Sequence, residues 1–309
     1  MIIKQEVQSY LSYCRNQKKL SQKSIKAYSI DLQQFISYFN RAKSNSLTKV
    51  VLCSYISELH KFYAPRTAKR KVASLRAFFN YLEFEECIDI NPFRKIQTKF
   101  QEPKTLPRVI PVHIIEQILS AAHKGHSRAK TQHEKFVTLR NAAIIEMLFA
   151  TGARVSELCS LKSADINLEN GSIRIIGKGK KERTLQIGHA DTLTLLRQYY
   201  KHRVSEADYC ENFFVNRLSS RISEQSVRSL IQNLCSEANI LLKITPHMFR
   251  HSFATLLLEE DVDIRYIQSM LGHSSIQTTQ IYTQVSTEKQ RQILTEKHPR
   301  NKINIETWS

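Results

Sequence analysis

The chain has 309 residues, more than one compact core usually takes, and suits two domains of about 100 to 200 residues each. Lysine and arginine number 46 against 28 acidic residues, so the formal net charge is +18 and we expect a polyanionic partner. The 41% hydrophobic content is that of a folded protein, and the chain shows no long apolar run, signal peptide or nucleotide-binding glycine motif. These features argue against a disordered, membrane-spanning, secreted or nucleotide-driven protein, and we expect a cytoplasmic one.

The cysteines and histidines do not indicate a metal site. The six cysteines lie far apart without a CxxC pair, which argues against a disulfide framework or a zinc ribbon. Residues 124–136 form a basic stretch that we expect to be a surface loop, and its histidines, together with His123, do not match a metal-ligand pattern. We therefore expect neither a metal ion nor an organic cofactor.

A proline-rich, basic stretch divides the chain. Four of the seven prolines lie between residues 92 and 111, where no helical period is visible. Because proline interrupts helices and central strands, this stretch is typical of an extended linker. We predict a first domain over residues 1–98, a linker over 99–111, a second domain over 112–285 and a C-terminal tail over 286–309.

The first domain shows four helical patterns. Ser21 is a candidate N-cap for a segment whose apolar residues recur at intervals of three and four from Ile25 to Phe39. Similar stripes run through 52–62 and 72–82, and an opening helix is expected near 3–16. Four cationic residues of the last helix lie off its apolar stripe, where they form either a phosphate-binding face or an ordinary solvated face. These residues are Arg66, Lys69, Arg70 and Arg76.

The second domain is predicted to combine helices with a small β-sheet, so that the whole chain is mainly α. Segments 172–176 and 183–187 alternate as strands do and flank a glycine-containing turn, which indicates a β-hairpin. Residues 213–216 are a candidate third strand. The hairpin tip carries Lys178, Lys180 and Lys181. Helices are expected near 112–122, 136–150, 154–161, 190–203, 223–238, 247–259, 263–270 and 276–284.

Two short motifs combine arginine with a carboxylate or with histidine. In ARVSEL, Arg154 follows the helix-terminating Gly152, and Glu157 lies three residues on, where it can pair with Arg154. In PHMFRHSFAT, a proline favours a helix start and places three functional residues on one helical turn. These residues are His247, Arg250 and His251. The intervening arginine and the missing glutamate argue against a zinc-binding pair of histidines.

A third motif, LGHSSIQTTQIYTQV, contains His273 at a helix junction and Tyr282 nine residues later. An isolated tyrosine is most often a packing residue. The threonine and glutamine neighbours of Tyr282, however, form a hydrophilic segment that does not require an aromatic side chain for packing.

Two arginines, two histidines, a hairpin lysine and a tyrosine suit attack on a phosphodiester. The pentacoordinate transition state carries extra negative charge, which two guanidinium groups stabilise through bidentate hydrogen bonds. A tyrosine with a reference pKa of about 10 needs a base or a positive field to become nucleophilic. The departing sugar alkoxide needs a proton, which a lysine at the hairpin tip can supply.

The motifs as a set resemble the active-site boxes of the tyrosine recombinase family, which includes phage integrases and Xer-like enzymes. The order Arg, Lys, His-x-x-Arg, His, Tyr is the same, and LSQKSIKAYSIDLQQFISYF resembles the family's N-terminal core-binding domain. The resemblance implies a four-helix, SAM-like core-binding domain followed by a mixed α+β catalytic domain. It also implies a site-specific recombinase that cuts and rejoins DNA through a 3′-phosphotyrosyl intermediate without metal or ATP.

The resemblance assigns a role to each matching residue. Arg154 and Arg250 would clamp the scissile phosphate, Lys178 would protonate the leaving 5′ oxygen, and His247 would assist proton transfer with the nucleophile. His273 would hydrogen-bond the phosphate.

Tyr282 would form the covalent bond. Glu157 and His251 would orient the arginine and the helix. Lys180 and Lys181 are expected to contact DNA together with the cations of the first domain.

The implied partners are double-stranded DNA with specific recombination sites and three further copies of the chain, forming a homotetramer on two sites. A second recombinase or an accessory protein is a possible addition, and the tail 286–309 is expected to pack on a neighbouring protomer. The expected setting is the bacterial cytoplasm, on the nucleoid when active. Two alternatives are a DNA-binding relative without catalysis and a topoisomerase of the IB type. The sequence does not specify the target site, the choice among integration, excision, inversion and resolution, or a role for 124–136.

Overall fold

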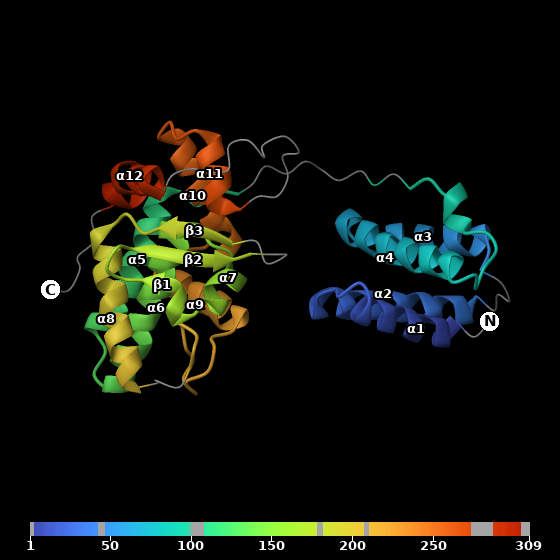
Figure 1. The fold of residues 1–309 in the computed structure, drawn as a ribbon, viewed down its shortest axis with the longest axis horizontal. Coiled ribbons are helices and arrows are strands. Elements are labelled where there is room, and N and C mark those ends of the chain that lie inside the picture. Colours follow the sequence, from blue (N-terminus) through green and yellow to red (C-terminus); the bar gives the residue numbers. More distant parts are fainter. Residues whose placement is uncertain are drawn as a thin grey trace. The chain divides into compact units, whose positions relative to one another are not determined.

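The computed structural model describes residues 3–42, 47–98, 100, 108–177, 182–206, 210–272 and 287–303. The chain divides into two compact units, Met1–Thr105 and Leu106–Ser309 (Figure 1). The fold is mainly helical with one small sheet, as the periodicity and the family resemblance predicted. No helix within the described ranges is both long enough and apolar enough to cross a bilayer.

The first unit is a four-helix domain. Its second helix begins where predicted, because the Ser21 hydroxyl accepts a hydrogen bond from the backbone N–H of Ser24 at 3.2 Å. The helices bury one face each around aromatic side chains that include Phe35 and Phe79, whose rings lie 6.0 Å apart. The elements are α1 (Ile3–Asn16), α2 (Gln22–Arg41), α3 (Lys49–Phe62), α4 (Pro65–Phe84) and the 3-10 helix η1 (Pro92–Lys95).

The second unit surrounds the C-terminal half of helix α6 (Gln132–Thr151), in which every residue from Ala142 to Thr151 is buried. Helices α10, α11 and α12 gather at one end of the unit (Figure 1). The helices other than α6 are α5 (Val112–Ser127), α7 (Val155–Ser160), α8 (Ala190–Glu206), α9 (Glu224–Glu237), α10 (Pro246–Glu259), α11 (Ile264–Leu271) and α12 (Thr287–Lys297), with 3-10 helices η2 (Ser163–Asp165) and η4 (Pro299–Lys302).

The sheet of the second unit has three antiparallel strands in the order β1 (Ile166–Asn167), β2 (Ser172–Ile176) and β3 (Glu182–Gln186). The predicted hairpin is therefore present, with Ile173 opposite Leu185. The prediction of a third strand at 213–216 is wrong. Those residues lie in the core, where Phe213, Phe214 and Val215 are fully buried, and Val215 forms only an isolated bridge.

The expected surface loop at 124–136 is largely helical. Helix α5 continues to Ser127, and α6 begins after Thr131, whose side chain and that of Glu134 form a reciprocal capping box. Only a short connection separates the two helices. His123 lies inside, with its Nε2 3.1 Å from the Glu146 carboxylate.

Residues 287–303 pack on the second unit of their own chain. Ile293, Leu294 and Ile303 are buried in its core, and the buried Arg300 donates hydrogen bonds to Glu146 of α6. The helix expected near 276–284 lies outside the described residues. A single chain does not test whether the tail exchanges between protomers, so that stays a prediction.

Candidate active site

Arg154 is placed by a sharp turn between α6 and α7. Gly152 caps the C-terminal end of α6 in the left-handed conformation (φ +58°), and an added Cβ there would lie 2.7 Å from the Phe253 ring, so a side chain is excluded. Arg154 then starts α7, and its Nη1 and backbone N–H each donate to the Glu157 carboxylate at 2.8 Å. The predicted pair is present, and 37% of the Arg154 side chain stays exposed.

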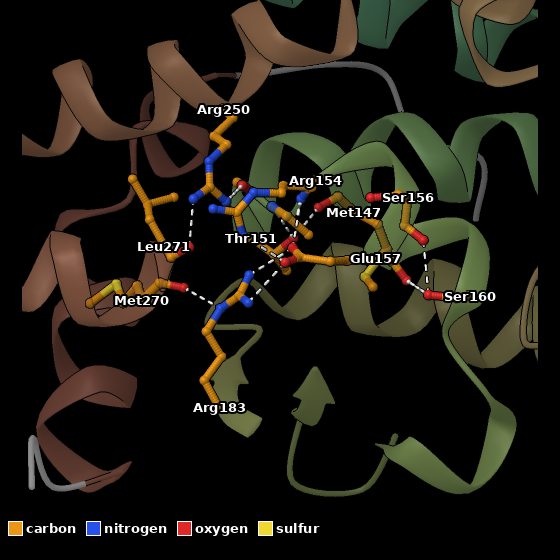
Figure 2. Close-up of polar contacts among 12 residues, drawn as sticks. Met147, Thr151, Arg154, Ser156, Glu157, Ser160, Arg183, Arg250, Met270 and Leu271 are labelled. Atoms are coloured by element: carbon orange, nitrogen blue, oxygen red, sulfur yellow. Dashed lines mark hydrogen bonds and ion pairs between the residues drawn. The ribbon is translucent and has the colours of Figure 1, made fainter. Parts of the chain in front are cut away.

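Arg250 reaches the same turn from α10, which begins at Pro246 as predicted. Its guanidinium is buried and donates to the carbonyl of Gly152 at 3.0 Å and to the carbonyl of Leu271. Burial and the nearby charge of Arg154 lower the pKa of Arg250 to about 10. Figure 2 shows the guanidinium groups of Arg154 and Arg250 lying close together.

A third arginine, Arg183 of β3, was not among the predicted site residues. Its Nη1 and Nη2 donate to both oxygens of Glu157 at 3.0 and 2.8 Å, and its Nε donates to the carbonyl of Met270 at 2.8 Å (Figure 2). Strand alternation was an available signal, because Arg183 is two residues from the buried Leu185 and therefore faces the same side of the sheet.

Glu157 is ionised in this setting. Burial raises the pKa of its carboxyl, but the hydrogen bonds and charges of Arg183 and Arg154 outweigh that effect and lower the pKa to about 2. One carboxylate thus faces three guanidinium groups, and the described part of the site keeps two positive charges in excess. Such a site favours a phosphate group.

The predicted histidines lie on the turn of α10 that carries Arg250. His247 is exposed and His251 is half-buried, and their ring centroids are 4.9 Å apart. The exposed imidazole of His247, on the same helical turn as Arg250, is accessible to a substrate at the protein surface.

Several predicted residues lie outside the described part of the chain. The flanking elements are described: β2 ends at Ile176, β3 begins at Glu182, and α11 ends at Gly272 in the left-handed conformation (φ +63°). The predicted residues that the structure does not describe are Lys178, Lys180, Lys181, His273 and Tyr282.

In the first unit, the four predicted cations of α4 are all exposed. Arg76 Nη2 donates to the Thr98 hydroxyl at 3.2 Å, whereas Arg70 pairs with the fully buried Asp31 and keeps 47% of its side chain exposed. The other two members of the set are Arg66 and Lys69.

Comparison with known families matches both units. The family model "Phage integrase family" covers residues 108–289, which is more than half of the chain, and "Phage integrase, N-terminal SAM-like domain" covers residues 7–86. The chain belongs to the phage integrase family. It is a site-specific tyrosine recombinase, an enzyme that cuts and rejoins DNA. Nothing in the comparisons favours a silent relative or a topoisomerase.

Curated relatives and solved structures agree with this assignment. The recombinase is 50% identical to a tyrosine recombinase of Agathobacter rectalis over 97% of its own length and 98% of the relative. It is 34% identical to tyrosine recombinase XerD of Listeria innocua, over 95% and 98% of the two chains.

The fold is similar to that of XerH site-specific recombinase bound to palindromic difH substrate, with a TM-score of 0.69 at 24% identity over 96% of this chain and 81% of XerH. The fold is also similar to that of a lambda integrase fragment bound to a core site, with a TM-score of 0.67 at 18% identity over 89% and 96% of the two chains.

Proposed function

We propose that this recombinase cleaves one DNA strand by attack of the Tyr282 hydroxyl oxygen on the scissile phosphorus. The bond from phosphorus to the 5′ oxygen breaks, a 3′-phosphotyrosyl bond forms, and Lys178 gives its proton to the departing 5′ oxygen. The phenolic proton leaves with assistance from His247. Attack by a 5′ hydroxyl of the partner strand reverses these steps and rejoins the DNA.

The convergence of Arg154 and Arg250 on the turn at Gly152 is the observation that carries this proposal. Charge develops on the nonbridging oxygens in the transition state, and fixed guanidinium groups stabilise it without reorganising. Arg250 is held by two backbone carbonyls, whereas Arg154 is held by Glu157 and partly exposed. We assign both to the scissile phosphate, with His273 as a further hydrogen-bond donor. His251 lies one residue from Arg250 and would support the helix that carries it.

Contacts with flanking DNA are assigned to the exposed cations. On α4, Arg66, Lys69, Arg70 and Arg76 present positive charge to solvent, and the net charge of +18 supports phosphate binding along the chain. Lys180 and Lys181 would add contacts from the hairpin tip.

For assembly we infer a homotetramer on two recombination sites, alone or with a second recombinase or an accessory protein. Lambda integrase forms a tetramer bound to a Holliday junction. In the assembled state the tail, residues 286–309, would pass to a neighbouring protomer, where residues 287–303 would occupy the surface that they cover in their own chain. The relatives come from bacteria, so the bacterial nucleoid is the inferred place of action.

Tyr282→Phe tests the chemistry. Wild-type protein incubated with sheared genomic DNA of the encoding organism in EDTA should form covalent adducts, and sequencing them identifies the site. Tyr282→Phe should form none and should bind that site with nearly unchanged affinity, since one hydroxyl and no charge is lost. Adducts with the Phe variant, or a requirement for a divalent metal, would overturn the proposal.

A further inference from the structure

Arg183 connects three segments that each carry part of the proposed chemistry. It lies on β3, five residues after Lys178, and its guanidinium bonds Glu157 of α7 and the carbonyl of Met270 in α11. The next carbonyl along α11, that of Leu271, accepts from Arg250. One side chain therefore ties together the elements that lead to the lysine, both arginines and His273.

We propose that Arg183 is a positioning residue for strand cleavage. It fixes the Glu157 carboxylate, which in turn fixes the guanidinium of Arg154. It also fixes the end of α11, from which the chain continues into His273. This inference rests on the proposed function and adds a residue to the machinery of that site.

Glu157 accepts four hydrogen bonds from two arginines. Each of its oxygens accepts one hydrogen bond from Arg154 and one from Arg183, at 2.8 to 3.0 Å. Without Arg183 the carboxylate keeps only its two hydrogen bonds from Arg154, one from the backbone and one from the side chain, and loses the partner on β3. The guanidinium of Arg154 is partly exposed, so packing alone does not hold it in place.

The arginine geometry is specific to this position. Three N–H groups of Arg183 point in two directions, toward Glu157 and toward the Met270 carbonyl, and only 12% of the side chain is exposed. A lysine ammonium on a flexible stem retains the charge but does not reproduce this planar fork. The variant Arg183→Lys therefore keeps the positive charge and removes the positioning hydrogen bonds, so that the two contributions can be measured separately.

Gly272 is adapted to the same side chain. A Cβ at Gly272 would lie 3.1 Å from Cδ of Arg183 and 3.2 Å from its Nη1, and the glycine has a positive φ of 63°. The end of α11 thus lies directly against the Arg183 side chain. Movement of Arg183 would therefore disturb the end of α11, after which the sequence continues with His273.

Arg174 of β2 supplies a matched control. Its Nε and Nη2 donate to Asp165 at 2.9 and 2.6 Å, and Arg174 is paired across the hairpin with Thr184, next to Arg183. Arg174 thus belongs to the same sheet as Arg183 and binds a carboxylate, and among the described residues its ion pairs are with Asp165 and Glu182 rather than with Glu157 or α11. Arg174→Lys therefore measures the cost of the substitution without the positioning effect.

The experiment uses full-length protein and a nicked duplex carrying the site recovered from wild-type adducts, under single-turnover conditions. Arg183→Lys should form the covalent adduct about 10- to 100-fold more slowly than wild type. Its affinity for the duplex should be unchanged, and Arg174→Lys should cleave at the wild-type rate. Both variants should have similar unfolding midpoints.

Two further measurements show whether Arg183 acts through Arg154 or through the hairpin lysine. Arg154→Lys combined with Arg183→Lys should be little slower than the slower single variant, because Arg183 acts through Glu157 on Arg154. A 5′-bridging phosphorothiolate, whose thiolate leaves without protonation, should restore cleavage by Lys178→Ala but leave Arg183→Lys slow.

Each contrary result has a distinct meaning. Wild-type cleavage by Arg183→Lys, or fully multiplicative losses with Arg154→Lys, would overturn the inference and leave the proposed function intact. Rescue of Arg183→Lys by the phosphorothiolate would show that Arg183 acts through the hairpin lysine instead. Absence of adducts with the wild type would overturn the proposed function itself.

Discussion

Two buried glutamates of the second unit, Glu157 and Glu146, both bind cationic side chains, but Glu157 lies in the candidate active site and Glu146 holds the C-terminal segment. In both, burial raises the pKa of the carboxyl, and hydrogen-bonded cationic partners outweigh it and lower the pKa to about 2. Glu146 lies on α6 and accepts hydrogen bonds from Thr192 at 2.9 Å and from Arg300 at 3.1 Å. Only 2% of the Arg300 side chain is exposed.

The difference lies in how many cations surround the carboxylate and in how exposed they are. Arg300 uses its remaining donors internally, with Nη1 bonded to the carbonyl of Ile303 at 2.9 Å. Two arginines bind Glu157, the charge of a third, Arg250, lies near it, and Arg154 remains partly exposed. The cluster at Glu146 is internally neutralised and holds the tail, whereas the cluster at Glu157 keeps positive charge for a ligand.

The largest expected effect is a loss of catalysis on substitution of an arginine in the Glu157 cluster. Arg154→Ala should slow formation of the covalent adduct by about 10²- to 10³-fold, since it removes a donor to the transition state. Its free energy of unfolding should change by less than about 1 kcal/mol, because Glu157 keeps Arg183 as its partner. Single-turnover cleavage and denaturant unfolding measure the two quantities. A large loss of stability with normal cleavage would show that the Glu157 cluster is an anchor as well.

A smaller, structural effect is expected at the other carboxylate. Arg300→Ala removes one partner of a buried ion pair, which costs about 3 kcal/mol or more. Amide hydrogen exchange over residues 287–303 should become about 100-fold faster.

Ending the chain at Val285 should preserve binding to one DNA site and abolish the two-site complex and recombination. A truncated protein that still forms tetramers with normal strand exchange would contradict tail exchange between protomers.

The smallest predicted effect is a pH dependence confined to the tail. His298 Nδ1 accepts the backbone N–H of Arg300 at 2.9 Å, and its Nε2 lies 3.2 Å from the carbonyl of Phe149, so the buried ring is neutral. Burial lowers the pKa of His298 to about 4. The unfolded segment therefore binds the proton first, and stability is lost as pH falls from about 6.5 to about 4.

The carboxylates respond in a lower range. Their depressed pKa values mean that stability is lost as pH falls from about 4.5 to about 2. Between pH 7 and 5, only His298 of these three groups should respond. The protection of the amides of residues 287–303 against hydrogen exchange should therefore drop on the order of ten-fold, while that of residues 154–160 should not change. Hydrogen exchange corrected for intrinsic rates measures both. Equal losses in the two segments would argue against His298 as the source.

Local signals allowed much of the fold to be predicted from the sequence. The Ser21 cap, the helix stop at Gly152 and the helix start at Pro246 depend on neighbouring backbone groups and steric limits, so each is visible within a few residues. The same holds for the pair of Arg154 and Glu157, which are three residues apart on one helical turn. Residue order alone sufficed to indicate the family.

Only the tertiary structure decided which distant groups meet. Arg183 lies 26 residues from Glu157, and Arg300 lies 154 residues from Glu146, so no local pattern specifies either pair. Residues 213–216 have the composition of a strand, but their burial in the core replaced pairing with a sheet neighbour. A sequence determines which side chains can carry charge or cap a helix. Packing determines which charges are neutralised and which remain available to a phosphate, because that depends on the partners that the fold brings within hydrogen-bond distance.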